Sequence, residues 1–218
     1  MQDYYALDML SNSRLGVVKC LRSGLPVMKV KRETLEFGRQ LHEAVFEPEV
    51  YNFKLSQPLQ FPQYQTHRHK VATMAKSARN NALLKYLLDN PLAKKEQDIF
   101  FKENKYNLDC KAKVDIWVGK TIGDLKTTDA TTREEFEERI LKYSYHRQGA
   151  FYLDATGAEK FIVFAVAKKF PHQTFTCTMT LDDPRIIEGR REYEELIDDY
   201  LTMLQTGEVN FQELMQAA

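Results

Sequence analysis

Apolar and charged residues alternate along residues 109–118 and again along residues 121–127. This period of two is typical of a strand with one apolar and one polar face. Gly119 and Lys120 separate the two runs, and a glycine at the first of two turn positions favours a type II′ hairpin. The pattern therefore predicts an antiparallel hairpin. Its expected apolar face consists of Ala112, Val114, Ile116, Val118 and Leu125.

The turn also predicts which residues of the hairpin face each other. It sets Val118 opposite Thr121, and counting back sets Asp115 opposite Asp124 on the charged, open face. Opposed residues have Cβ atoms about 5 Å apart, so the two carboxylates repel each other unless a cation lies between them. Mg²⁺ prefers such oxygen ligands, and Lys126 on the same face can orient a water molecule. A solvated ladder of surface charges is the alternative, and the hairpin alone leaves both interpretations open.

Helical periodicity and turn residues predict the other elements. The expected helices are a short one capped by Ser11 or Ser13 and ending at Leu21, then 34–46, 66–88 and 184–205. A further helix, 132–154, is expected between the last two, capped by Thr131 or Thr132 and bent near Tyr143. The expected strands, besides the hairpin, are 95–102, 160–168, 174–181 and one around 51–55. This order predicts an α/β fold in which helices flank a central mixed sheet, with a helical N-terminal elaboration, in a single domain spanning 1–218.

Composition indicates the cellular compartment and excludes one class of cofactor. The chain is 43% hydrophobic and 28% charged, as in ordinary globular proteins, and no apolar run approaches the ~20 residues of a membrane span. The first residues lack the basic start and apolar block of a signal peptide, so we expect a cytoplasmic protein with no membrane partner. Three scattered cysteines indicate reduced thiols and cannot supply a four-cysteine iron–sulfur cluster.

Charge is balanced overall but unevenly distributed. The formal net charge is zero, which argues against a globally basic nucleic-acid binder. Residues 1–32 nevertheless hold six Lys and Arg against two Asp, and residues 182–200 hold eight Asp and Glu against three Arg. We expect these segments to form two surfaces of opposite sign that meet head-to-tail between subunits of a ring.

Several polar residues lie at positions that suit either packing or chemistry. His42 falls on the apolar stripe of helix 34–46, where a histidine is more often a hydrogen-bonded core residue than a ligand. Glu96 and Asp98 share one face of strand 95–102, so spacing does not separate them as candidate carboxylates. A third group shares one face of helix 132–154 and could be a packing stripe. It consists of Tyr145, Gln148 and Tyr152.

The ordered motifs resemble a known nuclease family. The arrangement D-x8-D-x-K, ending in DLKTT, resembles the PD-(D/E)XK signature. The run FGRQLHEAVFEPE resembles the FG-x-x-x-H-x-x-x-x-EP segment of RecE-like exonucleases, the exonuclease VIII group with a RecB-type nuclease core. Y-x-x-Q-x-x-x-Y is similar to a RecB-type motif. The resemblance extends over nearly the whole chain and implies a restriction-endonuclease-like core.

The resemblance also implies roles for individual residues. Catalytic roles fall to Asp115, Asp124, Lys126 and Gln148. The implied ligands of Mg²⁺, for which Mn²⁺ can substitute, are His42, Glu96, Asp115, Asp124 and the Leu125 carbonyl. The implied substrate contacts are Gln148, Tyr152, Tyr145 and Arg14.

The activity that the resemblance implies is hydrolysis of linear double-stranded DNA from its ends, 5′ to 3′. The exposed strand would pass to a single-strand annealing protein during phage or prophage recombination, and the nuclease would form a homo-oligomeric ring. Two alternatives remain at this point. One is a structure-selective repair endonuclease with the same metal site, and the other is a non-catalytic DNA-binding protein on a nuclease fold.

Overall fold

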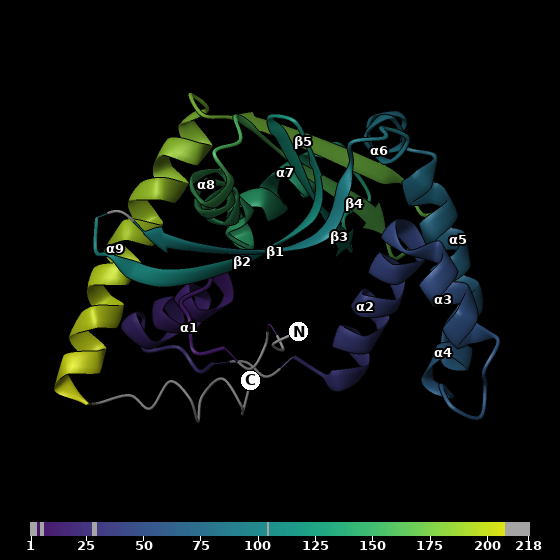
Figure 1. Ribbon diagram of the computed structural model, residues 1–218, viewed down its shortest axis with the longest axis horizontal. Coiled ribbons are helices and arrows are strands. Elements are labelled where there is room, and N and C mark those ends of the chain that lie inside the picture. The colour runs from purple at the N-terminus through teal and green to yellow at the C-terminus, as the bar shows by residue number, and fades with distance from the viewer. Residues whose placement is uncertain (1–3, 5–6, 28–29, 104, 208–218) are drawn as a thin grey trace.

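A five-stranded mixed sheet forms the centre of the molecule (Figure 1). The computed structural model describes residue 4 and residues 7–27, 30–103 and 105–207. The strands, in spatial order, are β1 (Lys94–Glu103), β2 (Leu108–Val118), β3 (Thr121–Thr128), β4 (Lys160–Ala167) and β5 (Thr174–Thr180). Neighbours are antiparallel except β3 and β4, which are parallel because two helices connect them. The predicted mixed sheet is thereby confirmed.

Helices cover both faces of this sheet. They are α1 (Asn12–Arg22), α2 (Arg32–Phe46), α3 (Pro48–Leu55), α4 (Gln63–Thr66), α5 (Arg68–Arg79), α6 (Ala82–Leu88), α7 (Arg133–Lys142), α8 (Tyr145–Thr156) and α9 (Pro184–Thr206). Alternate residues of β4 enter two separate cores, one shared with α1, α7, α8 and α9 and the other with α2, α3, α5 and α6. No helix in the described part of the chain has the length and apolar character to cross a membrane.

Three predicted elements differ from the structure. Residues 51–55 belong to α3 and not to a strand, because Pro48 occupies the first turn and fixes a helical φ there. The predicted helix 66–88 is interrupted at Asn81, whose side chain accepts a hydrogen bond from Leu84 N and so begins α6. The predicted helix 132–154 is two helices, because Ser144 adopts a left-handed φ of +53°. The bend expected near Tyr143 is therefore a complete break.

The hairpin register agrees with the count from the turn as far as the ladder extends. Val118 pairs with Thr121 and Ile116 pairs with Gly123, while Gly119 has a φ of +55°, as a type II′ turn requires. The ladder ends one step before the expected pair of aspartates. There Asp115 Oδ2 accepts a hydrogen bond from the backbone N–H of Leu125 at 2.6 Å.

The predicted single apolar face of the hairpin is wrong. Val114 belongs to the core of α8 and α9, whereas Ile116 and Leu125 belong to the core of α2 and α5. The change of side occurs at Asp115, which lies opposite Glu96 of β1. Neither of these two residues is paired in the β1–β2 ladder, and Glu96 has a left-handed φ of +49°. A residue in that conformation leaves the extended ladder, and the faces of β2 exchange at the point where this ladder is interrupted.

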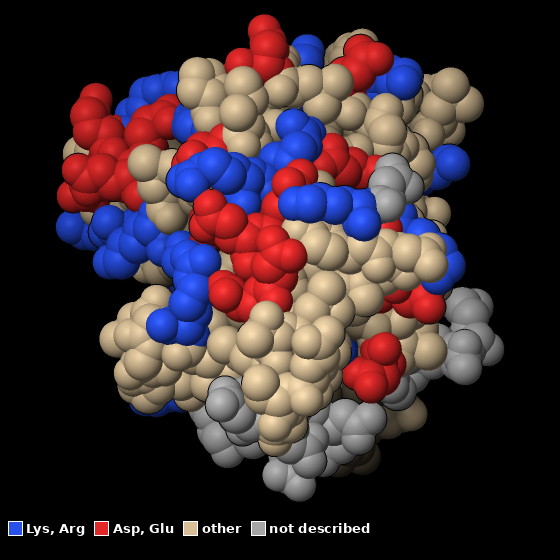
Figure 2. All heavy atoms as spheres, turned by 90° about the vertical axis from the view of Figure 1, so that its left-hand side faces the viewer, with Lys and Arg blue, Asp and Glu red and all other residues tan. Residues whose placement is uncertain are grey.

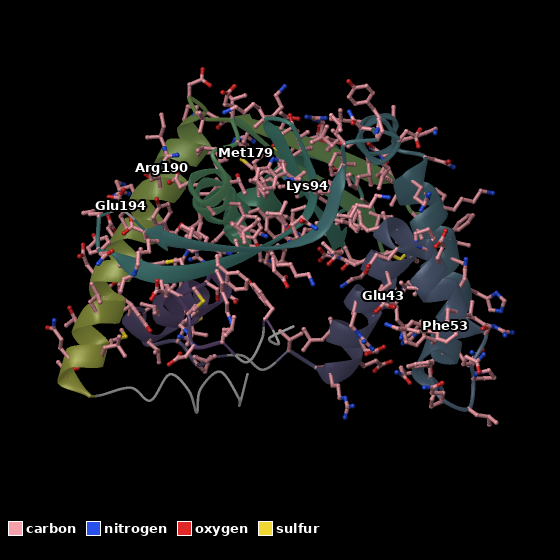
Figure 3. The ribbon with its side chains drawn as sticks, in the orientation of Figure 1. Glu43, Phe53, Lys94, Met179, Arg190 and Glu194 are labelled. Atoms are coloured by element: carbon pink, nitrogen blue, oxygen red, sulfur yellow. The ribbon has the colours of Figure 1, made fainter. Side chains whose placement is uncertain are left out.

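A polar cluster fixes α2, the helix that carries His42, against the helices beside it. Glu43 is buried and faces α3 (Figure 3). Its carboxylate accepts hydrogen bonds from Lys54 Nζ at 2.7 Å and from the Tyr64 hydroxyl at 2.5 Å. A buried carboxylate with two donors holds these helices in one relative position.

A second buried network joins α1, α8 and α9. The Glu192 carboxylate lies 2.8 Å from Lys19 Nζ, 3.0 Å from Arg147 Nη1 and 3.1 Å from His146 Nε2. Burial alone would raise the pKa of Glu192, but hydrogen bonds from His146 and Lys19 and the charge of Arg147 lower it to about 2. This network fixes α8, the helix that carries Gln148.

These contacts contradict the expected head-to-tail surfaces. Lys19 and Arg22 form ion pairs with α9 of the same chain, Arg22 to Glu195 and Asp199. Figure 2 shows acidic and basic side chains interleaved on the face of the molecule that carries α9. Two basic side chains of α1 and three acidic side chains of α9 thus pair within one subunit, and Lys29 lies outside the described residues.

Gly189→Ala is expected to destabilise the protein by about 2–3 kcal/mol. A Cβ at this position would lie 2.5 Å from the carbonyl oxygen of His146, so α8 and α9 would have to separate. Gly38→Ala is the matched control, because a Cβ there meets nothing within 4 Å. Alanine in a helix interior should stabilise that variant by about 0.5–1 kcal/mol. Urea unfolding checks both, and equal stabilities would contradict the close helix crossing.

Glu192→Gln is expected to lose stability at pH 7 and to approach the wild type as the pH falls towards 2. The lowered pKa means that the carboxylate stabilises the fold above its unfolded value of 4.5 and that this contribution disappears as the pH falls to about 2. We expect a loss of about 2–3 kcal/mol at pH 7, because Arg147 would remain buried without a counter-ion. Denaturant titrations at pH 7, 4.5 and 3 measure this, and a pH-independent difference would exclude the charge as its cause.

Candidate active site

The two aspartates of the hairpin are buried and not on an open face as expected. Asp115 is 5% exposed and Asp124 is 3% exposed. Lys126 Nζ lies 2.6 Å from Asp124 Oδ2, and Gln148 Nε2 of α8 donates a hydrogen bond to Asp124 Oδ1 at 2.6 Å. The expected open face is wrong because α2 and α8, distant in sequence, cover it.

His42 extends from α2 into the same group. Its Nε2 lies 2.9 Å from the carbonyl oxygen of Leu125, and its Nδ1 lies 3.5 Å from both Glu96 Oε1 and Asp115 Oδ1. The ligand atoms of His42, Glu96 and Asp115 all lie within 4.8 Å of one another. A helix, an edge strand and a central strand thus each contribute one donor to the same small volume.

The structure separates the two candidate carboxylates of β1. The Glu96 side chain is 17% exposed and points to His42, whereas the Asp98 side chain is 40% exposed. The left-handed φ of Glu96 turns it away from the regular strand alternation. Glu96 is therefore the carboxylate that joins the group, and Asp98 lies outside it, 3.9 Å from Lys113.

Charge complementarity determines the protonation of the group. Burial opposes the charged form of His42, but the carboxylates of Asp115 and Glu96 outweigh it and raise its pKa well above the usual value. Burial likewise disfavours the charged form of Asp115, yet His42 and Lys126 lower the pKa of that carboxyl. Burial also opposes the charge of Lys126, whose pKa is raised by Asp124 and Asp115. His42 and Lys126 are thus the cations that balance the acidic side chains.

Asp124 behaves differently from Asp115. Burial raises its pKa, the attraction of Lys126 lowers it, and the like charge of Asp115 raises it again, with a net increase. Two neighbouring carboxyl groups whose pKa values shift in opposite directions are typical of sites that bind a cation or exchange protons.

The donor set suits a hard divalent cation. It combines the three carboxylates of Glu96, Asp115 and Asp124 with an imidazole and a backbone carbonyl, and Mg²⁺ or Mn²⁺ takes such oxygen-rich sets. Glu96 Oε1 and Asp124 Oδ2 are buried, and they lie 3.5 Å from His42 Nδ1 and 2.6 Å from Lys126 Nζ, respectively. Buried carboxylate oxygens require positive charge nearby, which Lys126 and His42 supply here and a metal ion would supply more strongly.

The three residues predicted on one helix face lie on α8. Gln148 reaches Asp124, Tyr145 lies under Lys126 with Nζ 5.4 Å from the ring centre, and Tyr152 packs edge-on against Phe161 of β4. Burial raises the pKa of Tyr145 to about 12, so its hydroxyl stays protonated. A further residue lets α8 approach β4. A Cβ on Gly149 would lie 2.4 Å from the Phe161 ring.

One expected residue is not brought into the group, and one unexpected residue lies beside it. Arg14 is buried on α1 and donates a hydrogen bond to Asp8 at 2.7 Å. Lys113, which sequence reasoning did not select, has its Nζ 3.4 Å from Glu96 Oε2. Its position two residues before Asp115 on the charged side of β2 was the available signal.

Comparisons with known proteins agree with this geometry. Residues 25–212 match the family described as a PDDEXK-like domain of unknown function (DUF3799). No curated protein matches the chain. Among solved structures, the chain is similar to a protein from Eubacterium rectale named "Putative exonuclease", with 16% identity, a TM-score of 0.62, and coverage of 96% of this chain and 87% of that chain. This likeness shows the fold.

Two further structures are more distant. A phage related exonuclease from Haemophilus somnus 129PT has 16% identity, a TM-score of 0.43, and coverage of 86% of this chain and 82% of that chain. An alkaline exonuclease from Laribacter hongkongensis has 16% identity, a TM-score of 0.38, and coverage of 66% and 73%. The predicted PD-(D/E)XK core is confirmed by the family match and by the sheet. The chain belongs to the PDDEXK-like domain family, and this membership supports a metal-dependent nuclease.

Proposed function

We propose that the protein is a Mg²⁺-dependent exodeoxyribonuclease that hydrolyses linear double-stranded DNA from its ends. The observation that carries this proposal is the buried group in which Asp115, Glu96 and His42 converge beside Asp124 and Lys126. A group of this composition within a PDDEXK-like chain suits phosphodiester hydrolysis. Mn²⁺, with the same preference for oxygen and nitrogen donors, should substitute for Mg²⁺.

The residues would divide the chemistry as follows. The cation would be held by Glu96, Asp115, Asp124, the carbonyl of Leu125 and His42, whose imidazole would have to lose its proton to become a ligand. When bound, the cation would polarise the phosphoryl oxygens and lower the pKa of water at the site. Lys126, an ammonium with three donors and no acceptor, would orient the attacking water and stabilise the developing negative charge.

Gln148 and the tyrosines of α8 would position the substrate. Gln148 has two amide N–H groups, and one of them holds Asp124 in place. The other is suited to a phosphate oxygen. Tyr145 and Tyr152 flank this amide on the same helix and would support the bound strand.

The finer properties rest on the resemblance to RecE-like exonucleases. These are the 5′ to 3′ direction, transfer of the exposed strand to a single-strand annealing protein, a role in phage or prophage recombination, and a homo-oligomeric ring. The charge argument for the ring does not hold, because the basic and acidic segments pair within one chain. The first alternative, a structure-selective endonuclease, differs from an exonuclease because it does not need a free DNA end. A non-catalytic protein is disfavoured by the intact acidic residues and Lys126.

The test compares end-labelled linear duplex with covalently closed circular DNA, each with Mg²⁺ and with EDTA. The wild type should degrade the linear duplex only, and only with Mg²⁺. Lys126→Ala should reduce the rate by a factor of about 100 or more, since one electrostatic donor to the reacting group is lost. Lys120→Ala is the matched control, because this lysine lies at the hairpin turn with its side chain 68% exposed.

Each outcome separates the candidate functions. Cleavage of closed circles would replace the exonuclease with an endonuclease. Tight DNA binding with no turnover in Mg²⁺ would favour the non-catalytic protein. An equal rate for Lys126→Ala and Lys120→Ala would remove Lys126 from the mechanism while leaving the metal site in place.

Asp115→Asn and Asp124→Asn should both abolish cleavage, but they should differ in stability. Asp115 accepts the 2.6 Å hydrogen bond from Leu125 N and lies against His42, so we expect a loss of about 3 kcal/mol when its charge is removed. Asp124→Asn also removes a like charge beside Asp115, so its loss should stay below about 1 kcal/mol. Urea unfolding in EDTA measures both variants. A larger loss of stability for Asp124→Asn than for Asp115→Asn would contradict the structural role that we assign to Asp115.

A further inference from the structure

The break between α7 and α8 presents two tyrosines to the side of the site that carries Lys126. Ser144 has a left-handed φ of +53°, and its hydroxyl accepts a hydrogen bond from Lys19 Nζ at 3.1 Å. Non-glycine residues adopt this conformation at a cost of about 1 kcal/mol and are common at functional sites. The break brings the rings of Tyr143 and Tyr145 together, with their centres 5.8 Å apart.

These rings lie between two lysines. Lys126 Nζ lies 5.4 Å from the centre of the Tyr145 ring, and Lys142 Nζ lies 5.7 Å from the centre of the Tyr143 ring. The order lysine, ring, ring, lysine therefore runs from the buried carboxylates to the surface. We define this set of four side chains as the aromatic track.

Packing accounts for one of the two rings and not for the other. Tyr145 is partly buried and packs against the core of α8 and α9. Tyr143 is 49% exposed, and its ring is connected to the site through Tyr145, which lies beside Lys126. An exposed ring that continues a path from the reacting side chains is available to a ligand.

We propose that Tyr143 stacks on a nucleobase of the DNA strand whose phosphate reaches Lys126. This inference rests on the proposed nuclease function and deepens it. Aromatic side chains bind bases of any sequence by stacking, while neighbouring cations take the phosphates. In the aromatic track, Lys126 and Lys142 supply the cations and Tyr143 supplies the open π-face. Tyr143 would thus hold the terminal nucleotide while Lys126 acts on its phosphate.

The test uses a short duplex with 2-aminopurine at one nucleotide near the end, bound in Ca²⁺ to limit cleavage. Stacking changes the fluorescence of this base. The variants are Tyr143→Ala and Tyr143→Phe, which keeps the ring. The control is Tyr86→Ala on α6, a tyrosine that is 67% exposed on the helix layer of the other core. Thermal melting of each variant establishes that it is folded.

We expect the wild type, Tyr143→Phe and Tyr86→Ala to change the fluorescence at one terminal position and Tyr143→Ala to leave it unchanged. Tyr143→Ala should also bind the duplex about tenfold more weakly. Loss of the signal in Tyr143→Phe would assign the effect to the hydroxyl and overturn stacking. A wild-type signal in Tyr143→Ala, or equal losses in Tyr143→Ala and Tyr86→Ala, would overturn it as well.

The same samples in Mg²⁺ separate this inference from the proposed function. If the wild type cleaves the duplex and Tyr143→Ala changes the 2-aminopurine fluorescence as much as the wild type does, the stacking role alone fails. If the wild type cleaves neither this duplex nor longer linear DNA, the nuclease proposal fails, and the stacking inference fails with it.

Discussion

Burial of neighbouring carboxylates is the constraint on which the rest of the structure depends. Asp115 and Asp124 are almost fully buried, and Glu96 joins them from the next strand. Removing an ion from water costs several kcal/mol even after the protein relaxes, and like charges add to that cost. Two cations from different elements offset it, His42 from α2 and Lys126 from β3. The site therefore holds α2 against the sheet as well as supplying chemistry.

The backbone departs from regular structure where this group requires it. Glu96 takes a left-handed conformation, the β1–β2 ladder is interrupted opposite Asp115, and the β2–β3 ladder stops before Asp124. These interruptions free Asp115 to accept a hydrogen bond from Leu125 N and turn Glu96 towards His42. Backbone strain of about 1–3 kcal/mol per residue persists only where surrounding contacts hold it, and here the ion pairs provide them.

Local pattern was sufficient for the five strands of the sheet, for α1, α2 and α9, and for the grouping of Asp115, Asp124 and Lys126. The roles of His42, Glu96 and Gln148 came from the family resemblance, because pattern alone left them open. Alternation fixed the hairpin, and the spacing of Asp115, Asp124 and Lys126 placed them together. Pattern could not reveal that the faces of β2 exchange, because the exchange occurs at Asp115, where the ladder with a different strand is interrupted opposite Glu96. The burial of the acidic face had the same kind of cause, since α2 and α8 cover it from distant parts of the chain.

Sequence-level charge reasoning failed at the ends of the chain for a related reason. Counting residues indicated a basic segment and an acidic helix. In the structure the two pack together, and Glu192 forms ion pairs with Lys19 and Arg147. Charges that lie far apart in sequence cannot be assigned to separate surfaces until the packing is known.

That pairing has a consequence for how a protein of zero net charge would bind DNA. Phosphate binding is driven by cations that are free to replace counter-ions, and two of those on α1, Lys19 and Arg22, are paired with acidic residues of α9. Beside the site, Lys113 and Lys126 are also paired, with Glu96 and Asp124. A divalent ion that neutralised these carboxylates would release both lysines towards a phosphate. Metal and DNA would then favour each other's binding. The metal ion would neutralise the carboxylates and leave the two lysines unpaired, and the DNA phosphates would pair with those lysines.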